Sequence, residues 1–136
     1  MERMTHLILA FLVLLLFGFV LSFPIYMAFF AFIGVLLPDL DVRPKKLHRK
    51  LFHNIWFLII VLFIAYNLGL DKNTAIILSI GFISHLIGDS LTHKGIMPLW
   101  PIKKPKFNGP VKTGGFGEYL IVLVLLLLIY WIGTMI

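Results

Sequence analysis

The chain has 136 residues, 60% of them hydrophobic, a formal net charge of +6 and no cysteine. This length suits one domain, which we assign to residues 1–136, and the hydrophobic share exceeds what the interior of a soluble domain of this size can hold. The composition therefore indicates an integral membrane protein. The lack of cysteine excludes disulfides and thiolate metal ligands.

Five apolar runs are predicted to form helices, over residues 6–22, 24–37, 52–70, 74–92 and 118–135. Because proline fits the start of a helix and not its middle, Pro24 divides the first two runs into a helical hairpin. Asn73 or Thr74 is expected to cap the fourth helix. The prediction is an all-α, polytopic membrane bundle of about five transmembrane helices, the first two forming the hairpin.

The basic residues are distributed unevenly about these runs. If every run crosses the membrane, eleven of the twelve Lys and Arg residues fall on one side and only Lys72 on the other. The positive-inside rule then places the N-terminus in the cytoplasm and the C-terminus outside the inner membrane. Because topology explains the charge, the bilayer is the expected partner and nucleic acid is not. The sequence leaves the oligomeric state open.

The histidines and most of the aspartates gather at the predicted cytoplasmic ends of the helices. His85, Asp89 and His93 recur every four residues, so they are expected to share one helix face. The other members lie beside the first three runs: His6, Asp39, Asp41, His48 and His53. Such residues are costly in a bilayer unless they have partners, and this convergence predicts a metal site.

Imidazole and carboxylate ligands without thiolate suit a divalent cation. Zinc is favoured, manganese, iron or magnesium are alternatives, and the number of ligands allows one or two ions. Taken singly, some of these residues also fit purely structural roles. His85 and Asp89 could form a hydrogen bond between helices, and Asp39 and Asp41 could serve as turn residues after Pro38. The convergence of all these residues on one side favours the metal.

Three motifs carry a family resemblance: PDLD at 38–41, HRKLFH at 48–53 and GFISHLIGDSLTHKGIMPLWP at 81–101. They resemble the inner-membrane, metal-dependent hydrolase family related to the LexA-regulated YdjM-like proteins. The resemblance covers nearly the whole chain and implies hydrolytic activity. It also implies a metal site that includes His6, Asp39, Asp41, His48, His53, His85 and Asp89.

The resulting hypothesis is a membrane-embedded metal-dependent hydrolase that acts on a phosphoester of a lipid or another amphiphile at the cytoplasmic headgroup level. Asp41 or Asp89 is expected to act as the general base, and the Arg49 guanidinium to bind phosphate. Weaker candidates for supporting roles are His93, Glu118 and Lys112. The alternative is a non-catalytic metal-binding membrane protein, either an adaptor or a carrier. A carrier is less favoured because the apolar runs offer no continuous polar path.

Overall fold

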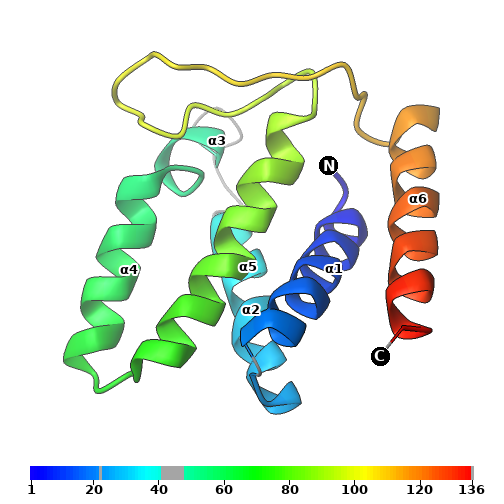
Figure 1. The fold of residues 1–136 in the computed structure, drawn as a ribbon. Helices are drawn as coiled ribbons and strands as arrows, with labels where there is room; N and C mark the ends of the chain where they lie inside the picture. The colour runs from blue at the N-terminus through cyan, green and yellow to red at the C-terminus, as the bar shows by residue number, and fades with distance from the viewer. Residues whose placement is uncertain (22, 41–47, 136) are drawn as a thin grey trace.

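The computed structural model describes residues 1–21, 23–40 and 48–135, and the backbone alone at residues 19–21, 25, 48 and 49. The described chain is helical, apart from two isolated β-bridges in the long connection that follows α5 (Figure 1). The elements in order are α1 (Arg3–Leu21), η1 (Ile25–Met27), α2 (Ala28–Leu36), η2 (Leu37–Leu40), α3 (His48–Leu51), α4 (Ile55–Asn67), α5 (Lys72–Ser90) and α6 (Phe116–Gly133).

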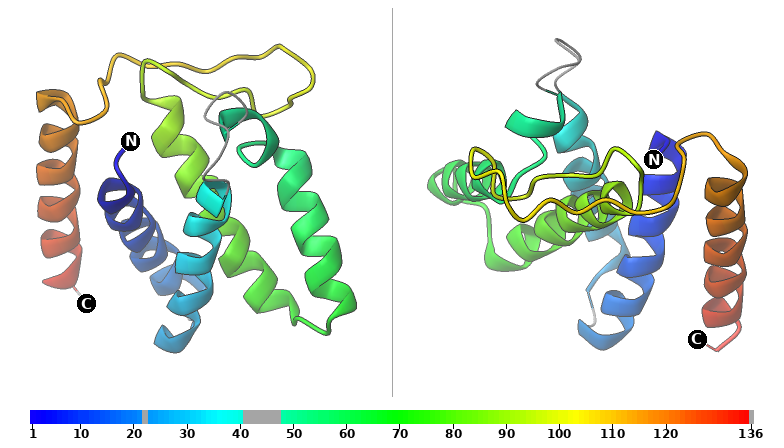
Figure 2. Two further views of the ribbon diagram at one scale, coloured as in Figure 1. Left: turned by 180° about the vertical axis from the view of Figure 1, so that it is seen from behind. Right: turned by 90° about the horizontal axis from the view of Figure 1, so that it is seen from above.

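The central element is α5, which packs against α1, α2 and α4 (Figures 1 and 2). Leu78, Phe82 and Leu86 of α5 form a core cluster with Leu58 of α4 and Ile96 of the following connection. Burial of these side chains is the main apolar contribution that holds α4 and the connection against α5. The polar residues of interest follow in the last two turns of the same helix.

The carboxylate of Asp71 caps the start of α5. Its Oδ2 accepts hydrogen bonds from the backbone N–H groups of Asn73 and Thr74, at 3.0 and 3.1 Å, and the Thr74 hydroxyl donates to Oδ1 at 2.6 Å. The prediction that Asn73 or Thr74 is the cap is wrong, because Asp71 satisfies both free N–H groups. The hydrogen bond from the Thr74 side chain lowers the pKa of Asp71.

The α2 and α5 helices approach each other so closely that glycine is required at both surfaces. A Cβ on Gly34 of α2 would overlap the carbonyl oxygen of Leu78, and a Cβ on Gly81 of α5 would overlap the carbonyl oxygen of Ala31. Small residues at such positions let two helix backbones come into contact, a pattern common between helices in membranes. This contact fixes the position of α2 along α5.

The connection between α5 and α6 crosses one end of the bundle (Figure 1). Its two halves pair through hydrogen bonds between the backbones of Ile96 and Phe107, 2.8 and 3.0 Å long. The carbonyl of Pro98 also accepts from the N–H of Ile55 at 2.8 Å, which ties the connection to the start of α4. From its far end, α6 runs back along α1 (Figure 2).

The prediction of about five transmembrane helices is wrong. Within residues 1–21, 23–40 and 48–135, α6 is the one helix both long and apolar enough to cross a membrane, with 18 residues, 11% of them buried. The apolar stretches Arg3–Gly18, Ala28–Leu40 and Ile55–Asn67 are each shorter than that, at 10–17 residues.

Helix length and polarity explain the difference. The 13 residues of α4 reach about 20 Å, whereas the hydrocarbon core of a bilayer is about 30 Å thick. With 19 residues α5 has the length, but polar residues interrupt it at both ends, among them Lys72, Asn73, His85 and Asp89. The apolar runs of the sequence are thus divided by turns and 3-10 segments, and polar residues occupy the central helix.

The α2–α5 contact yields a stability prediction. Gly81→Ala places a methyl group against the backbone of Ala31, which cannot move aside as a side chain would. Overpacking of this kind costs about 1–3 kcal/mol, so the thermal midpoint followed by circular dichroism in detergent should fall by several degrees. Gly117→Ala on α6 is the control, because no atom lies within 4 Å of its added Cβ. Equal midpoints for the two variants would contradict the close contact.

Candidate metal centre

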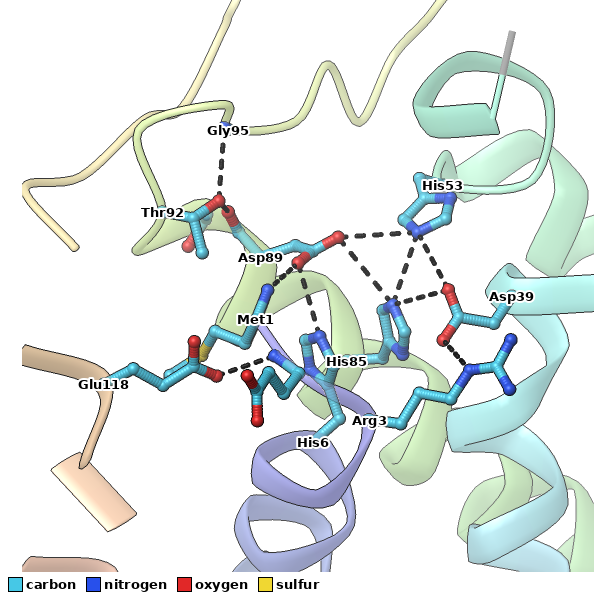
Figure 3. Close-up of polar contacts among 12 residues, drawn as sticks. Met1, Arg3, His6, Asp39, His53, His85, Asp89, Thr92, Gly95 and Glu118 are labelled. Carbon is cyan, nitrogen blue, oxygen red and sulfur yellow. Dashed lines mark hydrogen bonds and ion pairs between the residues drawn. The ribbon is translucent and has the colours of Figure 1, made fainter. Parts of the chain in front are cut away.

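Five side chains from separate parts of the chain meet at the end of the bundle beneath the connection (Figure 3). We call them the His/Asp cluster. They come from the first turn of α1, from η2, from the turn between α3 and α4, and from α5: His6, Asp39, His53, His85 and Asp89.

The ring of His85 is oriented by the backbone of α2. Its Nδ1 lies 2.8 Å from the carbonyl oxygen of Val35, so Nδ1 carries the proton and donates. In the neutral ring, Nε2 then presents its lone pair to the cluster. Burial and the neighbouring His6 lower the pKa of His85 to about 2, which keeps the ring neutral and able to bind a metal.

A second histidine faces this lone pair. His53 Nε2 lies 3.3 Å from His85 Nε2 (Figure 3). The next residue, Asn54, fixes this position. Its Oδ1 accepts a hydrogen bond from the backbone N–H of Phe57 at 2.8 Å and so caps α4. The Asn54 side-chain amide also donates to the carbonyl of Leu51 at 2.7 Å, which closes the turn after α3. His53 is therefore held, fully buried, between two short helical segments.

Two carboxylates complete the centre. Oδ1 of Asp39 lies 3.9 Å from Nε2 of both His53 and His85. Oδ2 of Asp89 lies 3.4 Å from Nε2 of His53 and 3.8 Å from Nε2 of His85. Each carboxylate thus places one oxygen near both imidazole nitrogens, and imidazole with carboxylate is the donor chemistry of a divalent-cation site.

The other oxygen of Asp89 extends the cluster toward α1. Oδ1 accepts from the N-terminal ammonium of Met1 at 2.6 Å and lies 3.3 Å from Nε2 of His6. The His6 ring also stacks on the His85 ring, with centroids 3.9 Å apart. Asp89 therefore joins two groups of potential ligands through its two oxygens.

His6 depends on a glycine for its place. A Cβ on Gly88 would lie 2.7 Å from Nδ1 of His6, so only glycine leaves room for the ring at this position of α5. Among the described side chains, Nδ1 of His6 is a buried nitrogen without a hydrogen-bond partner. A buried polar atom left in this state is rare in folded proteins, and here it faces the surface of α5 at Gly88.

The geometry fits one or two cations. His6, His85 and Asp89 offer ligand atoms within 4.8 Å of one another, and so do Asp39, His53 and His85. His85 belongs to both groups, and the single free lone pair on its Nε2 can bind one ion. These buried groups could therefore hold a metal ion, with His85 at the centre of the donor set.

The remaining sequence candidates take other places. His93 and Lys112 are exposed on the connection. Glu118 is buried, but its carboxylate accepts from the N–H groups of Glu2 and Gly114 at 2.6 and 2.8 Å, so it anchors the start of the chain. Asp41 lies outside the described residues, as do the side chains of His48 and Arg49.

The structure adds residues that sequence reasoning missed. Arg3 Nε lies 3.7 Å from Oδ2 of Asp39, beside the most open part of the cluster. Asn54, Gly88 and the ammonium of Met1 position the ligands. An asparagine just before an apolar run is a helix-cap signal, so Asn54 could have been found. Arg3 and Gly88 carry no such local signal.

Over the residues that the structure describes, the fold and the cluster define a helical protein with one bilayer-length apolar helix and a buried His/Asp centre. The YdjM inner membrane protein family matches residues 1–136, the whole chain, and the chain belongs to this family. The family resemblance of the motifs is thereby confirmed, whereas regulation by LexA stays a prediction. The uncharacterized protein YvsG of Bacillus subtilis (strain 168) is 32% identical over 119 residues, 73% of this chain and 72% of that protein. No solved structure matches the chain.

The cluster predicts metal binding that a single ligand can abolish. Elemental analysis of protein purified without chelators should find at least one transition-metal ion per chain. His85→Ala should remove most of it, because His85 belongs to both ligand groups. His93→Ala is the matched control, since this exposed histidine lies outside the cluster. Metal-free wild-type protein, or equal losses in the two variants, would contradict the assignment.

Proposed function

We propose that the protein is a membrane-associated, metal-dependent hydrolase that cleaves a phosphoester of a lipid or another amphiphile. The observation that carries the proposal is the convergence of two imidazole nitrogens and two carboxylates at one end of α5. Membership in an inner membrane protein family supports an amphiphilic substrate. The 11% burial of α6 supports contact between that helix and lipid.

His53, His85 and Asp89 would hold the first cation, with Asp39 beside them, and His6 would take part if a second one binds. Zinc suits this mixture of imidazole and carboxylate, with manganese, iron or magnesium as alternatives. A divalent cation would supply Lewis acidity toward a phosphoryl oxygen and toward water. The chain itself supplies the orientation of the ligands, through the Val35 carbonyl and Asn54.

Asp39 is the best placed proton acceptor among the described residues. Its side chain is 18% exposed, against 3% for Asp89, whose two oxygens already face Met1 and the three histidines. In the proposed reaction, water adds its oxygen to phosphorus and a water proton passes to Oδ2 of Asp39. The phosphorus–oxygen ester bond breaks, and the leaving oxygen takes up that proton. The products are an alcohol and a phosphate.

The orientation of α6 follows from the charges beside it. Five exposed lysines lie on the connection before α6: Lys94, Lys103, Lys104, Lys106 and Lys112. No charged residue follows the last turn of α6. The positive-inside rule favours a cytoplasmic connection and an external C-terminus. Because the connection covers the His/Asp cluster, the cluster would lie on the cytoplasmic side.

A second function is favoured by the burial of the ligands. His6, His53, His85 and Asp89 are each no more than 2% exposed, as in a closed structural metal site. The protein would then be a metal-stabilised membrane adaptor without catalysis. A structural metal would raise the unfolding temperature strongly when bound, and no substrate would be consumed.

Hydrolysis of phosphoesters decides between the two functions. Purified protein in detergent should release phosphate from p-nitrophenyl phosphate or from extracted phospholipids, lose activity with a chelator, and regain it with zinc or manganese. Asp39→Asn should lower the rate by about 10²–10⁴-fold, the usual contribution of a general acid–base group. The matched control is Asp71→Asn, which alters a carboxylate far from the cluster. Release of no phosphate from any of these substrates by metal-loaded protein would favour the adaptor.

Cysteine labelling tests the orientation of α6, because the native chain has no cysteine. A cysteine in place of Thr134 should react with an impermeant thiol reagent added to intact cells. A cysteine in place of Lys104 should react only after the membrane is permeabilised. The reverse pattern would place the cluster on the external side.

A further inference from the structure

An apolar groove lies between α1, α2 and α6. Its volume is about 420 Å³, and every side chain that lines it is apolar: Leu7, Ile8, Phe11, Phe32, Leu126 and Ile129. The helix that forms one wall, α6, is the helix of bilayer length and is 11% buried. The open side of the groove therefore faces the surroundings of α6, which for a membrane protein are lipid chains.

The groove and the cluster both take residues from the first turns of α1. Leu7 follows His6 directly, and Arg3 lies four residues before Leu7, on the same face of the helix. Arg3 is 69% exposed, and its Nε lies 3.7 Å from Oδ2 of Asp39. Oδ1 of the same carboxylate lies 3.9 Å from both His53 and His85. Arg3 therefore lies one helical turn from a residue that lines the groove and pairs with a carboxylate of the cluster.

We propose that this groove holds the acyl chain of a lipid phosphoester, and that the Arg3 guanidinium contacts its phosphate. The proposal rests on the proposed function and names the substrate class. We assign a membrane lipid as the occupant because a lipid joins an apolar chain to a phosphate. The groove is wholly apolar, and the cationic Arg3 lies one helical turn before Leu7. A guanidinium matches two phosphate oxygens at once, and Arg3 is 69% exposed with Nε 3.7 Å from Asp39 Oδ2.

The arrangement also accounts for how a lipid would reach a buried centre. Of the five side chains in the cluster, Asp39 has the largest exposed fraction, and Arg3 lies beside it. A phosphate bound by Arg3 would therefore approach the cluster at its open side. A chain seated in the groove would hold the headgroup there.

Photocrosslinking in lipid nanodiscs tests the proposal with the full chain. The probe is phosphatidic acid with a diazirine in one acyl chain, and the reference is phosphatidylcholine with the same chain. Crosslinks of phosphatidic acid should concentrate on Leu7, Phe11 and Ile129 rather than on the outer face of α6. Leu126→Trp should fill the groove and lower the yield at these sites at least fivefold. Leu127→Trp is the matched control, because Leu127 does not line the groove.

Arg3→Gln tests the headgroup contact separately. It should bring the yield ratio of phosphatidic acid to phosphatidylcholine close to one while the groove crosslinks persist. If Leu126→Trp fails to fold by circular dichroism, Ile129→Trp replaces it. Equal crosslinking over all faces of α6, crosslinks to a second copy of the chain in place of lipid, or an unchanged yield in a folded groove-filling variant would overturn the proposal.

Crosslinking and phosphate release together distinguish a failure of the lipid-site proposal from a failure of the hydrolase proposal. Crosslinking needs neither metal nor turnover, so groove-specific crosslinks in a protein that releases no phosphate would support the lipid site and refute the hydrolase. Phosphate release without groove-specific crosslinks would refute the lipid site and leave the hydrolase intact.

Discussion

A buried carboxylate organises this protein. Asp89 is 2% exposed, and an ionised group in such a place is stable only with charged or hydrogen-bonding partners. Its partners come from the start of the chain, from α1, from the turn between α3 and α4, and from α5 itself. Removing one partner of a buried ion pair typically costs about 3–5 kcal/mol. The elements around the cluster are thus held together by the same contacts that make it a candidate metal centre.

The packing of α2 on α5 serves the same centre. Gly34 and Gly81 allow the two backbones to touch, and Val35, next to Gly34, accepts the Nδ1–H of His85. A looser contact would move the Val35 carbonyl away and free the His85 ring to rotate. Small residues in two helices therefore determine the tautomer and direction of a histidine in the cluster. A ligand that is oriented in this way loses less entropy when it binds a cation.

The protein also has exposed apolar surface on two of its helices. Large hydrophobic side chains are exposed on α4 and α6, for example Phe63 and Leu127 at 70% and 59%. In a member of an inner membrane protein family, such surfaces meet lipid. The cluster lies at the end of the bundle where the basic connection crosses (Figure 1), and the apolar groove lies between α1, α2 and α6. A polar centre and an apolar groove in one bundle are the features on which the proposed amphiphilic substrate rests.

The sequence by itself determined the chemistry of this centre and the helical class. Histidine and aspartate without cysteine limited the ligand types, and the four-residue spacing of His85 and Asp89 placed both on one face of α5. The same spacing failed for His93, because α5 ends at Ser90 and the N–H of His93 bonds to Val111 instead. Periodicity along a chain specifies a face only as far as the helix continues.

The tertiary structure decided which residues meet and how many helices can cross a membrane. Arg3, Gly88 and the Val35 carbonyl join the cluster through contacts between segments far apart in the sequence, which no local pattern encodes. Apolar composition also could not distinguish a helix that crosses a bilayer from a shorter one packed against neighbours. Helix boundaries decide whether an apolar helix is long enough to cross. The Asn54 and Asp71 caps and the 3-10 turns set these boundaries, and hydrophobicity alone does not.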